Sequence, residues 1–425
     1  MPDRPELMAI GDSIYNGTRS LTTNAELAAL AVPAQVARAF GWDFRTPSYP
    51  REILFDLEYL FRSGRFDLDG LKQSVLANAQ AWLDQGRWSD EDCFDNISIA
   101  QTTIADQAAL TYNNSVSKIA GLIDKVRDAE GFDFVGVVPA LYEAINASFL
   151  LNPSNDPASV FADRTPLEIV AERRPKRLLV NIGINDGIWT ICLMATKDQF
   201  APDAIATDMH DLGVRLNDMR QAGRIDRVYL NLLPKPSCVA NLMPRVDPGA
   251  LPRGADYFPE YLGRLGQIGG LSGAEMKALD QGVRDLNRRI ADDLTETFGG
   301  DGLAFVDAYA MMELHDNKHY RETREHEVWI KDWRINNVPL QRWPHKGGLY
   351  GLDNLHPTAV GYAILAQAVC QRIEAVEGLA PVAPIDLAAA FRSDSLLTDV
   401  PRRLDISLLL INLVVAFAAL ARPGV

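Results

Sequence analysis

Short apolar runs alternate with longer amphipathic segments along most of the chain, and this alternation is the strongest constraint on its fold. Five runs are apolar enough to be strands buried on both faces, and residues 133–138 are a weaker sixth candidate. The five runs are residues 7–10, 96–99, 177–182, 228–233 and 303–306. Segments with helical periodicity lie between or after them, at residues 25–40, 106–127, 203–222, 273–298 and 358–376. Strands separated by helices form parallel units, so we expect an α/β fold: a three-layer α/β/α sandwich with a central parallel sheet of about five strands, as in flavodoxin-like folds.

The 425 residues are predicted to form one main domain with an extension. We expect this domain to span residues 1–385, with loop insertions near 139–175 and 234–272, parts of which are rich in Pro and Gly. Residues 386–425 are predicted to be a C-terminal extension that ends in an apolar helix.

The C-terminal tail is the most apolar part of the chain. Between Leu408 and Ala421 the single polar residue is Asn412. Fourteen residues are too few to span a bilayer, which takes about 20. Two interpretations stay open for residues 404–421: docking on the protein's own surface or a second subunit, and attachment to a membrane surface.

Charge and cysteine content exclude several classes of function. The net charge of −14 disfavours nucleic-acid binding. The four cysteines form no Cys-x-x-Cys pair, which argues against a zinc ribbon or a redox motif. They are Cys93, Cys192, Cys238 and Cys370. The first residues contain no apolar secretion signal, so a cytoplasmic protein is expected.

Polar residues at the ends of the predicted strands suggest nucleophilic catalysis. Ser13 follows the first strand in "AIGDS", and Asn185 follows a later one in "VNIGIND". Near the end of the chain Asp353 precedes His356 by three residues, and Pro357 is expected to open an amphipathic helix. An imidazole can take the proton of a serine hydroxyl, and a carboxylate behind it fixes its tautomer. The Ser13 backbone N–H and the Asn185 amide would supply donors to an oxyanion.

These segments together resemble a known family. "AIGDSIYNG", "NIGIND" and "DNLHPTAVGYA" resemble blocks I, III and V of the SGNH/GDSL hydrolases, in that order, and "HKGGLYGLDNLHPTAVGYAILAQAV" is similar to the lipase-type branch. The resemblance implies Ser13 as nucleophile and oxyanion donor, Asn185 as a second oxyanion donor, His356 as base and Asp353 as its orienting carboxylate.

Block II departs from the family pattern. The segment "DNISIAQTTIADQ" resembles this block, with Gln101 where the family usually has Gly. The backbone N–H of Gln101 would be the third oxyanion donor, although Gly accepts backbone geometries that Gln resists. Asp186, which follows Asn185, is interpreted as a structural hydrogen-bonding residue.

Other chemically interesting side chains have simpler interpretations. The histidines near residue 320 have a spacing that suits a metal, but a solvated surface segment is the preferred reading, and no metal site is predicted. They are His315, His319 and His326. Four apolar residues are candidates for an acyl pocket or for ordinary core. They are Phe149, Leu150, Trp189 and Trp343.

The sequence therefore predicts a serine esterase or lipase that hydrolyses carboxylic esters through an acyl-enzyme, without a cofactor. The partner would be a small-molecule or lipid ester. The chain lacks Gly-x-Ser-x-Gly, a phosphate-binding loop and His-Glu-x-x-His. Two alternatives remain: an acyltransferase that uses the same residues, and a catalytically weak relative that binds lipid or carbohydrate.

Overall fold

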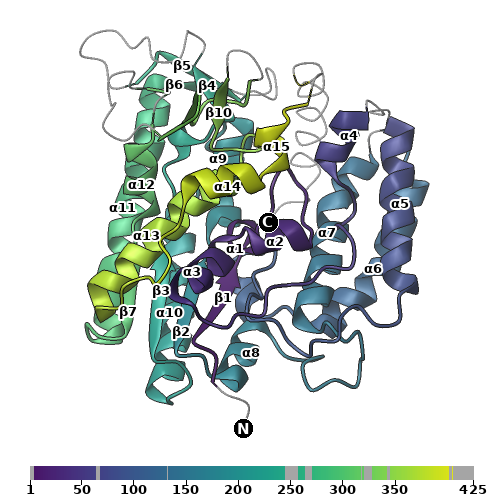
Figure 1. The fold of residues 1–425 in the computed structure, drawn as a ribbon, viewed down its shortest axis with the longest axis horizontal. Helices are drawn as coiled ribbons and strands as arrows, with labels where there is room; N and C mark the ends of the chain where they lie inside the picture. The colour runs from purple at the N-terminus through teal and green to yellow at the C-terminus, as the bar shows by residue number, and fades with distance from the viewer. Residues whose placement is uncertain are drawn as a thin grey trace.

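A parallel sheet forms the centre of the fold. The computed structural model describes residues 4–63, 68–131, 133–244, 257–263, 270–316, 318–319, 328–341, 345–401 and 404. Within them the sheet has four strands in the order β1-β2-β3-β7, all parallel. These are β1 (Leu7–Gly11), β2 (Arg177–Asn181), β3 (Arg227–Asn231) and β7 (Leu303–Val306). β1 runs upward from the N-terminus in Figure 1, so the carboxyl ends of the strands lie together toward the top of that view.

The fifth expected strand, residues 96–99, lies beside β1 without forming a regular strand. Ile97 N donates to Ala9 O at 2.9 Å and Ile99 N donates to Gly11 O at 2.8 Å. The Asn96 side chain accepts a hydrogen bond from Ser98 N, and such local side-chain bonds compete with a regular ladder. The sheet therefore has four strands and one bridging segment where about five strands were expected.

Alternate residues of the strands face opposite layers, as a sheet covered on both sides requires. On one face, Leu7 and Ala9 belong to the core cluster that includes α3 (Val32–Phe40) and α13 (Ala359–Glu377). On the other face, Met8 and Ile10 belong to the cluster that includes α10 (Pro202–Gln221) and α11 (Gly273–Phe298). The predicted three-layer arrangement follows from this period of two.

Two of the expected helices are interrupted. Residues 25–40 form α2 (Ala25–Ala29) and then α3, because Pro33 stands in the first turn of α3, where proline is accepted and a continued helix is not. Residues 106–127 form a short 3₁₀ turn (Ala105–Ala108) and then α6 (Tyr112–Asp128), whose N-cap is Thr111. Other helices in the N-terminal part of the chain are α4 (Leu57–Ser63), α5 (Leu68–Asp84) and α8 (Pro166–Arg173).

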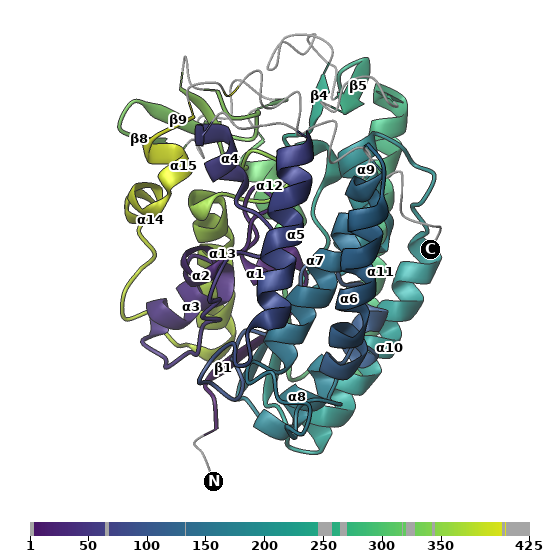
Figure 2. The same ribbon diagram turned by 90° about the vertical axis from the view of Figure 1, so that its right-hand side faces the viewer.

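The predicted weak strand at 133–138 is wrong: these residues enter α7 (Phe134–Leu151). A wholly apolar run has no period that separates a buried strand from a buried helix. The apolar stretch continues to Leu151, and this length favours a helix. α7 is the one helix in the described residues that is long and apolar enough to cross a membrane, and 67% of it is buried within the fold. Figure 2 shows α5, α6 and α7 side by side as a helical wall along one flank of the sheet.

Small sheets, one antiparallel and one mixed, lie beyond the carboxyl ends of the central strands (Figure 1). One joins β4 (Leu242–Pro244), β5 (Glu260–Gly263) and β6 (Leu271–Ser272), within the segment expected to be a loop insertion. Another contains β8 (Val328–Ile330), β9 (Trp333–Asn336) and β10 (Lys346–Gly348).

The C-terminal segment packs on α13 through α14 (Leu387–Ser393), which is followed by α15 (Ser395–Thr398). Between these two helices Asp394 is fully buried and forms an ion pair with Arg19. Asp394 also accepts a hydrogen bond from Ala359 N at the start of α13, at 2.8 Å. The apolar tail at 408–421 lies outside the described residues, so both interpretations of it stay open.

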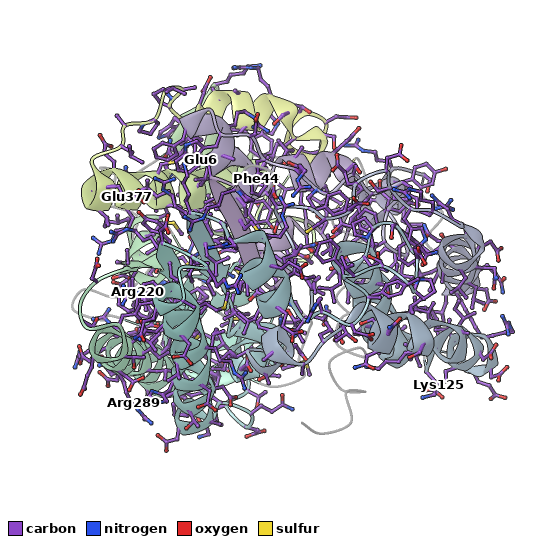
Figure 3. All side chains as sticks on the ribbon, turned by 90° about the horizontal axis from the view of Figure 1, so that it is seen from below. Glu6, Phe44, Lys125, Arg220, Arg289 and Glu377 are labelled. Atoms are coloured by element: carbon purple, nitrogen blue, oxygen red, sulfur yellow. The ribbon has the colours of Figure 1, made fainter. Side chains whose placement is uncertain are left out.

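The amino ends of the strands carry an ionic cluster. Arg177 at the start of β2 contacts Glu6 at 3.1 Å and Glu377 at 2.6 Å. Figure 3, which views the molecule from below, shows Glu6 and Glu377 close to one another at this end. The Arg177 guanidinium also lies over the Trp42 ring, 4.6 Å from its centroid. Ion pairs thus join β2 to Glu6 and Glu377 at the amino ends of the strands, and the opposite end of the sheet holds the candidate site.

Candidate active site

Ser13 lies at the carboxyl end of β1, at the first residue of the short helix α1 (Ser13–Asn16). Asp12 caps this helix by accepting a hydrogen bond from Ile14 N at 3.0 Å. Gly11 has a φ of +147°, and a Cβ atom at this position would lie 2.1 Å from the Asn181 carbonyl oxygen. A glycine is therefore required where the end of β1 passes the end of β2.

His356 and Asp353 lie on the loop before α13. His356 Nδ1 is 2.7 Å from Asp353 Oδ2, and His356 Nε2 is 2.9 Å from Ser13 Oγ. All three side chains are buried or nearly so, with the Ser13 residue 7% exposed. Ser13 and His356 are 343 positions apart in the sequence, yet together with Asp353 they form one hydrogen-bonded series.

Backbone N–H groups from the loop and from Leu21 hold the Asp353 carboxylate in place. The backbone N–H groups of Leu355 and His356 donate to Asp353 Oδ1 at 3.0 Å, and Leu21 N donates to Oδ2 at 2.9 Å. Burial by itself would raise the pKa of Asp353, but the His356 imidazole and these N–H groups hold the pKa below its usual range. Asp353 is therefore a carboxylate at neutral pH.

The start of the following helix differs from the expected one. Pro357 lies in an isolated bridge with Tyr350, and Thr358 is the N-cap of α13, whose first residue is Ala359. Thr358 accepts a hydrogen bond from Gly361 N, which an N-cap side chain does and a proline cannot do. His356 therefore lies in the loop, two residues ahead of the cap.

The two remaining oxyanion candidates lie on adjacent loops. Gln101 has a φ of +76°, in the left-handed region that favours glycine. Asn185 lies in a short π-helical turn (Ile184–Ile188) and donates its side-chain amide to Thr102 O at 2.9 Å. Asp186 accepts from Ile104 N with both carboxylate oxygens at 3.3 Å. The loop after β2 is therefore hydrogen-bonded to the loop that contains Gln101.

A chain of buried polar side chains beneath Ser13 was not predicted. Asn181 donates to Asp12 Oδ1 at 2.8 Å, Asn231 donates to Asn181 Oδ1 at 2.8 Å, and Tyr15 donates to Asn231 Oδ1 at 2.9 Å. Asn181 and Asn231 are the last residues of β2 and β3. The sequence signal was present: two apolar strand runs each contain an asparagine at the position where the strand ends.

Asp12 is the unusual member of this chain. Burial raises the pKa of Asp12 to about 7, against the hydrogen bonds from Ile14 N and Asn181 that lower it. Its Oδ2 atom is buried without a hydrogen-bond partner among the described residues. Burial similarly raises the pKa of Asp186 to about 7. The carboxyl edge of the sheet thus holds one carboxyl group with a lowered pKa, Asp353, and two whose pKa burial raises to about 7, Asp12 and Asp186.

Two cavities meet at the Ser13–His356 pair. The first, named the α7 cavity, is bounded by α5 and α7 of the helical wall and by the Gln101 loop. The second, named the α13 cavity, is bounded by α12 (Ala308–Leu314), by α13 and by the loop that carries His356. Ser13, His356 and Trp189 line both cavities. The reactive groups therefore lie where the cavities join.

Trp189 begins α9 (Trp189–Met194), and its ring centroid is 5.6 Å from that of His356. Phe149 and Leu150, the other described candidates for an acyl pocket, are fully buried in the core on α7. Trp343 lies outside the described residues. Of the candidates for an acyl pocket, Trp189 is thus the one that lines the cavities in the described part of the chain.

The histidines near residue 320 divide between two environments. His319 contacts Asp316 at 2.6 Å through Nδ1 and the Tyr261 hydroxyl through Nε2, deep in the protein. His315 lines the α13 cavity. His326 lies outside the described residues, and the described residues contain no group of three or more His, Cys, Asp or Glu side chains arranged to hold a metal.

Comparisons with known proteins add little to this arrangement. No protein-family model matches the chain, and no curated protein matches it. Among solved structures the chain is similar to Axe2, an acetylxylan esterase from Geobacillus stearothermophilus, with 13% identity and a TM-score of 0.31 over 87% of this chain and 94% of that chain. The mixed α/β character of the fold rests on its own strands and helices. A TM-score of this size carries no conclusion about activity, so function is inferred from the side chains of the site.

Proposed function

We propose that this protein is a serine esterase that hydrolyses carboxylic esters through an acyl-enzyme. The observation that carries the proposal is the hydrogen-bonded series from Ser13 Oγ through His356 to Asp353, with distances of 2.9 and 2.7 Å. A nucleophile within reach of a base that is itself oriented by a third group is the signature of an activated hydroxyl. The order of the motifs along the chain, which resembles that of lipase-type SGNH/GDSL hydrolases, supports the same conclusion.

The geometry gives each residue a step. Ser13 Oγ attacks the ester carbonyl while its proton passes to His356 Nε2. The resulting imidazolium lies against the Asp353 carboxylate, which stabilises its charge and keeps the neutral ring in the tautomer with hydrogen on Nδ1. His356 then gives the proton to the departing alkoxide. Water, deprotonated by His356, attacks the acyl-enzyme and releases the acid.

The oxyanion is assigned three donors: Ser13 N–H, Gln101 N–H and the Asn185 amide. The left-handed backbone of Gln101 supports its assignment, because this is the conformation that the family's glycine would adopt without strain. Asn185 donates to Thr102 O, so its side chain is already held beside the Gln101 loop before substrate binds. Preorganised donors of this kind stabilise the transition state without a cost of reorganisation.

An acyltransferase that uses the same residues is the second candidate. The apolar α13 cavity favours it, because an apolar alcohol bound there would compete with water for the acyl-enzyme. Turnover of an ester in the presence of 1-butanol separates the two activities. Free acid as the main product supports the hydrolase, and butyl ester as the main product supports the transferase.

Labelling with a fluorophosphonate probe tests the proposal directly. The probe should attach to Ser13, identified by peptide mass mapping, and labelling should cease in Ser13→Ala. Ser237 is a matched control, since it is buried and bonded to the Asp280 carboxylate but has no imidazole partner among the described residues. Ser237→Ala should therefore keep the label. A wild-type protein that neither labels nor hydrolyses p-nitrophenyl esters would instead be a binding relative.

A further inference from the structure

The two cavities at Ser13 are separated by α9. Trp189 lines both, whereas Cys192 lines the α13 cavity and Leu193 lines the α7 cavity. These residues belong to one short helix, so α9 is a partition whose first residue stands beside His356. A substrate bound at Ser13 therefore meets two separate compartments, one on each side of the reacting carbon.

Both compartments are mainly apolar. None of the described residues that line either cavity is Asp, Glu, Lys or Arg. Leu71, Val75 and Val138 are typical of the α7 cavity, and Met312 and Ile364 of the α13 cavity. A phosphate, ammonium or carboxylate group on either side of the ester would lose its hydration without gaining a lysine, arginine or carboxylate partner, and the polar side chains His315 and Asn337 lie in the α13 cavity alone. Such a pair of cavities suits an apolar group on each side of the bond.

The chemistry of the intermediate indicates which group enters which cavity. The departing oxygen must face His356 Nε2 to receive its proton. Leu355 and Pro357, the two neighbours of His356, line the α13 cavity, so the alcohol side of the ester extends there. Ala100 and Gln101, on the loop assigned to the oxyanion, line the α7 cavity, which leaves that cavity for the acyl chain.

On the basis of the proposed function, we infer that the substrate is a neutral ester with an apolar group on both sides, its acyl chain in the α7 cavity and the apolar part of its alcohol in the α13 cavity. Sugar acetates fit this arrangement poorly, because they have a two-carbon acyl group and a polar alcohol. Each CH₂ transferred from water into either cavity contributes about 0.8 kcal/mol, or roughly a threefold to fourfold gain in affinity.

Hydrolysis of simple alkyl alkanoates, followed by acid release, tests the inference on the full-length protein. We expect kcat/KM to rise about threefold per CH₂ from ethyl acetate to ethyl hexanoate, and by a similar factor from ethyl acetate to hexyl acetate. Hexyl hexanoate should exceed both. Turnover that ignores the length of the alcohol, or that favours a peracetylated xylose over hexyl hexanoate, would overturn the inference while leaving the esterase proposal in place.

Two variants test the assignment of the cavities. Val138→Trp fills the α7 cavity and should lower kcat/KM for ethyl hexanoate by about tenfold or more, with less than a twofold change for hexyl acetate. Met312→Trp fills the α13 cavity and should do the reverse. Activity on ethyl acetate and the melting temperature report whether each variant is folded. A reversed pattern, or both variants affecting the same side, would contradict the assignment.

Matched controls lie on the same helices. Ala140→Trp on α7 and Leu314→Trp on α12 place the same side chain at exposed positions, and both should leave the chain-length profile unchanged. A binding measurement separates this inference from the proposed chemistry. Calorimetric titration of Ser13→Ala should show hexyl hexanoate binding at least tenfold more tightly than ethyl hexanoate or hexyl acetate. Such binding without turnover by the wild-type protein would refute the proposed esterase activity and keep the inference about the cavities. If hexyl hexanoate does not bind preferentially, the inference about the cavities is refuted.

Discussion

Two segments of this chain carry the same short pattern, Asp-Asn-x-His, at residues 353–356 and 316–319. In both, the carboxylate contacts Nδ1 of the histidine three residues later, at 2.7 Å in the first and 2.6 Å in the second, and both pairs are buried. The difference lies at Nε2. His356 Nε2 faces Ser13 Oγ at the junction of two cavities, whereas His319 Nε2 faces the Tyr261 hydroxyl inside the protein.

The Asp316–His319 pair holds neighbouring segments together through buried hydrogen bonds. Asp316 also accepts a hydrogen bond from the Asn337 side chain at 2.9 Å. Burial by itself would raise the pKa of Asp316, but His319 and the buried Lys318 hold the pKa well below its usual range. Lys318 donates to the carbonyls of Val239 and Leu242, which brings the start of β4 to this cluster. The comparison teaches that an oriented histidine becomes a base only where a nucleophile and a space for substrate meet its free ring nitrogen.

Removing the hydroxyl that each histidine faces should give the largest contrast. Ser13→Ala should lower kcat by about 10⁶-fold, because the attacking atom is lost. Tyr261→Phe, which removes the hydroxyl facing His319, should change kcat by less than twofold. Steady-state kinetics on an ester substrate measure both. Comparable losses in the two variants would show that the second pair also takes part in turnover.

Removing the charge of each aspartate should separate catalysis from stability. Asp353→Asn should lower kcat by about 10⁴-fold, since the amide permits the wrong imidazole tautomer. Asp316→Asn should instead lower the free energy of unfolding by roughly 3 kcal/mol, because it leaves the buried Lys318 without the charge of Asp316 and disturbs the hydrogen bond to His319. Chemical denaturation and kinetics on the folded fraction measure the two effects. A loss of kcat with Asp316→Asn in fully folded protein would contradict the division of roles.

The assigned oxyanion donors are a further difference between the two pairs, because the proposal places them beside Ser13 and His356 and assigns none to the Asp316–His319 pair. Asn185→Ala should lower kcat by about 10²–10³, the usual cost of one donor, with little change in KM. Its neighbour Asp186 is a suitable control: Asp186→Asn should keep kcat within a few-fold. A variant at Asn185 that raises KM and leaves kcat unchanged would mean that this side chain binds the substrate in its ground state.

The smallest effect concerns two carboxyl groups of opposite character at the same edge of the sheet, Asp353 and Asp12. Because burial raises the pKa of Asp12 to about 7, the folded protein keeps a proton there that the unfolded chain releases near pH 4. The contribution of Asp12 to stability therefore falls as pH rises from about 4 to about 7, and is constant above that range. The pKa of Asp353 is lowered, so its contribution is lost only as the solution becomes strongly acidic.

Asp12→Asn removes this titration. Relative to wild type, the variant should gain roughly 2–3 kcal/mol of stability between pH 5 and pH 8. Thermal unfolding gives the stability difference between variant and wild type at each pH. Comparing this difference at pH 8 with that at pH 5 cancels any pH-independent cost of the substitution. Equal wild-type and variant slopes would show that Asp12 is ionised throughout this range.

The expectations from sequence were most successful where a local pattern has one physical meaning. The runs at 7–10, 177–182, 228–233 and 303–306 all form parallel strands, because a short apolar run between amphipathic helices must be buried on both faces. The run at 133–138 has the same composition and is helical, since composition without a period leaves the choice to length and neighbours. The asparagines that end β2 and β3 were visible, but their partners were not.

The sequence by itself indicated the α/β class, the strands that Ser13 and Asn185 follow and the pairing of Asp353 with His356, because strand periodicity, glycine at a tight approach and a three-residue Asp–His spacing are local properties. It also supplied a second Asp–His pair of the same spacing at 316–319. Only the tertiary structure decided which pair meets a serine, that Gln101 adopts a left-handed backbone, that burial raises the pKa of Asp12, and that two mainly apolar cavities join at Ser13. Each of these depends on contacts between segments distant in the chain, where burial and packing set the chemistry of a side chain that no neighbour in sequence can specify.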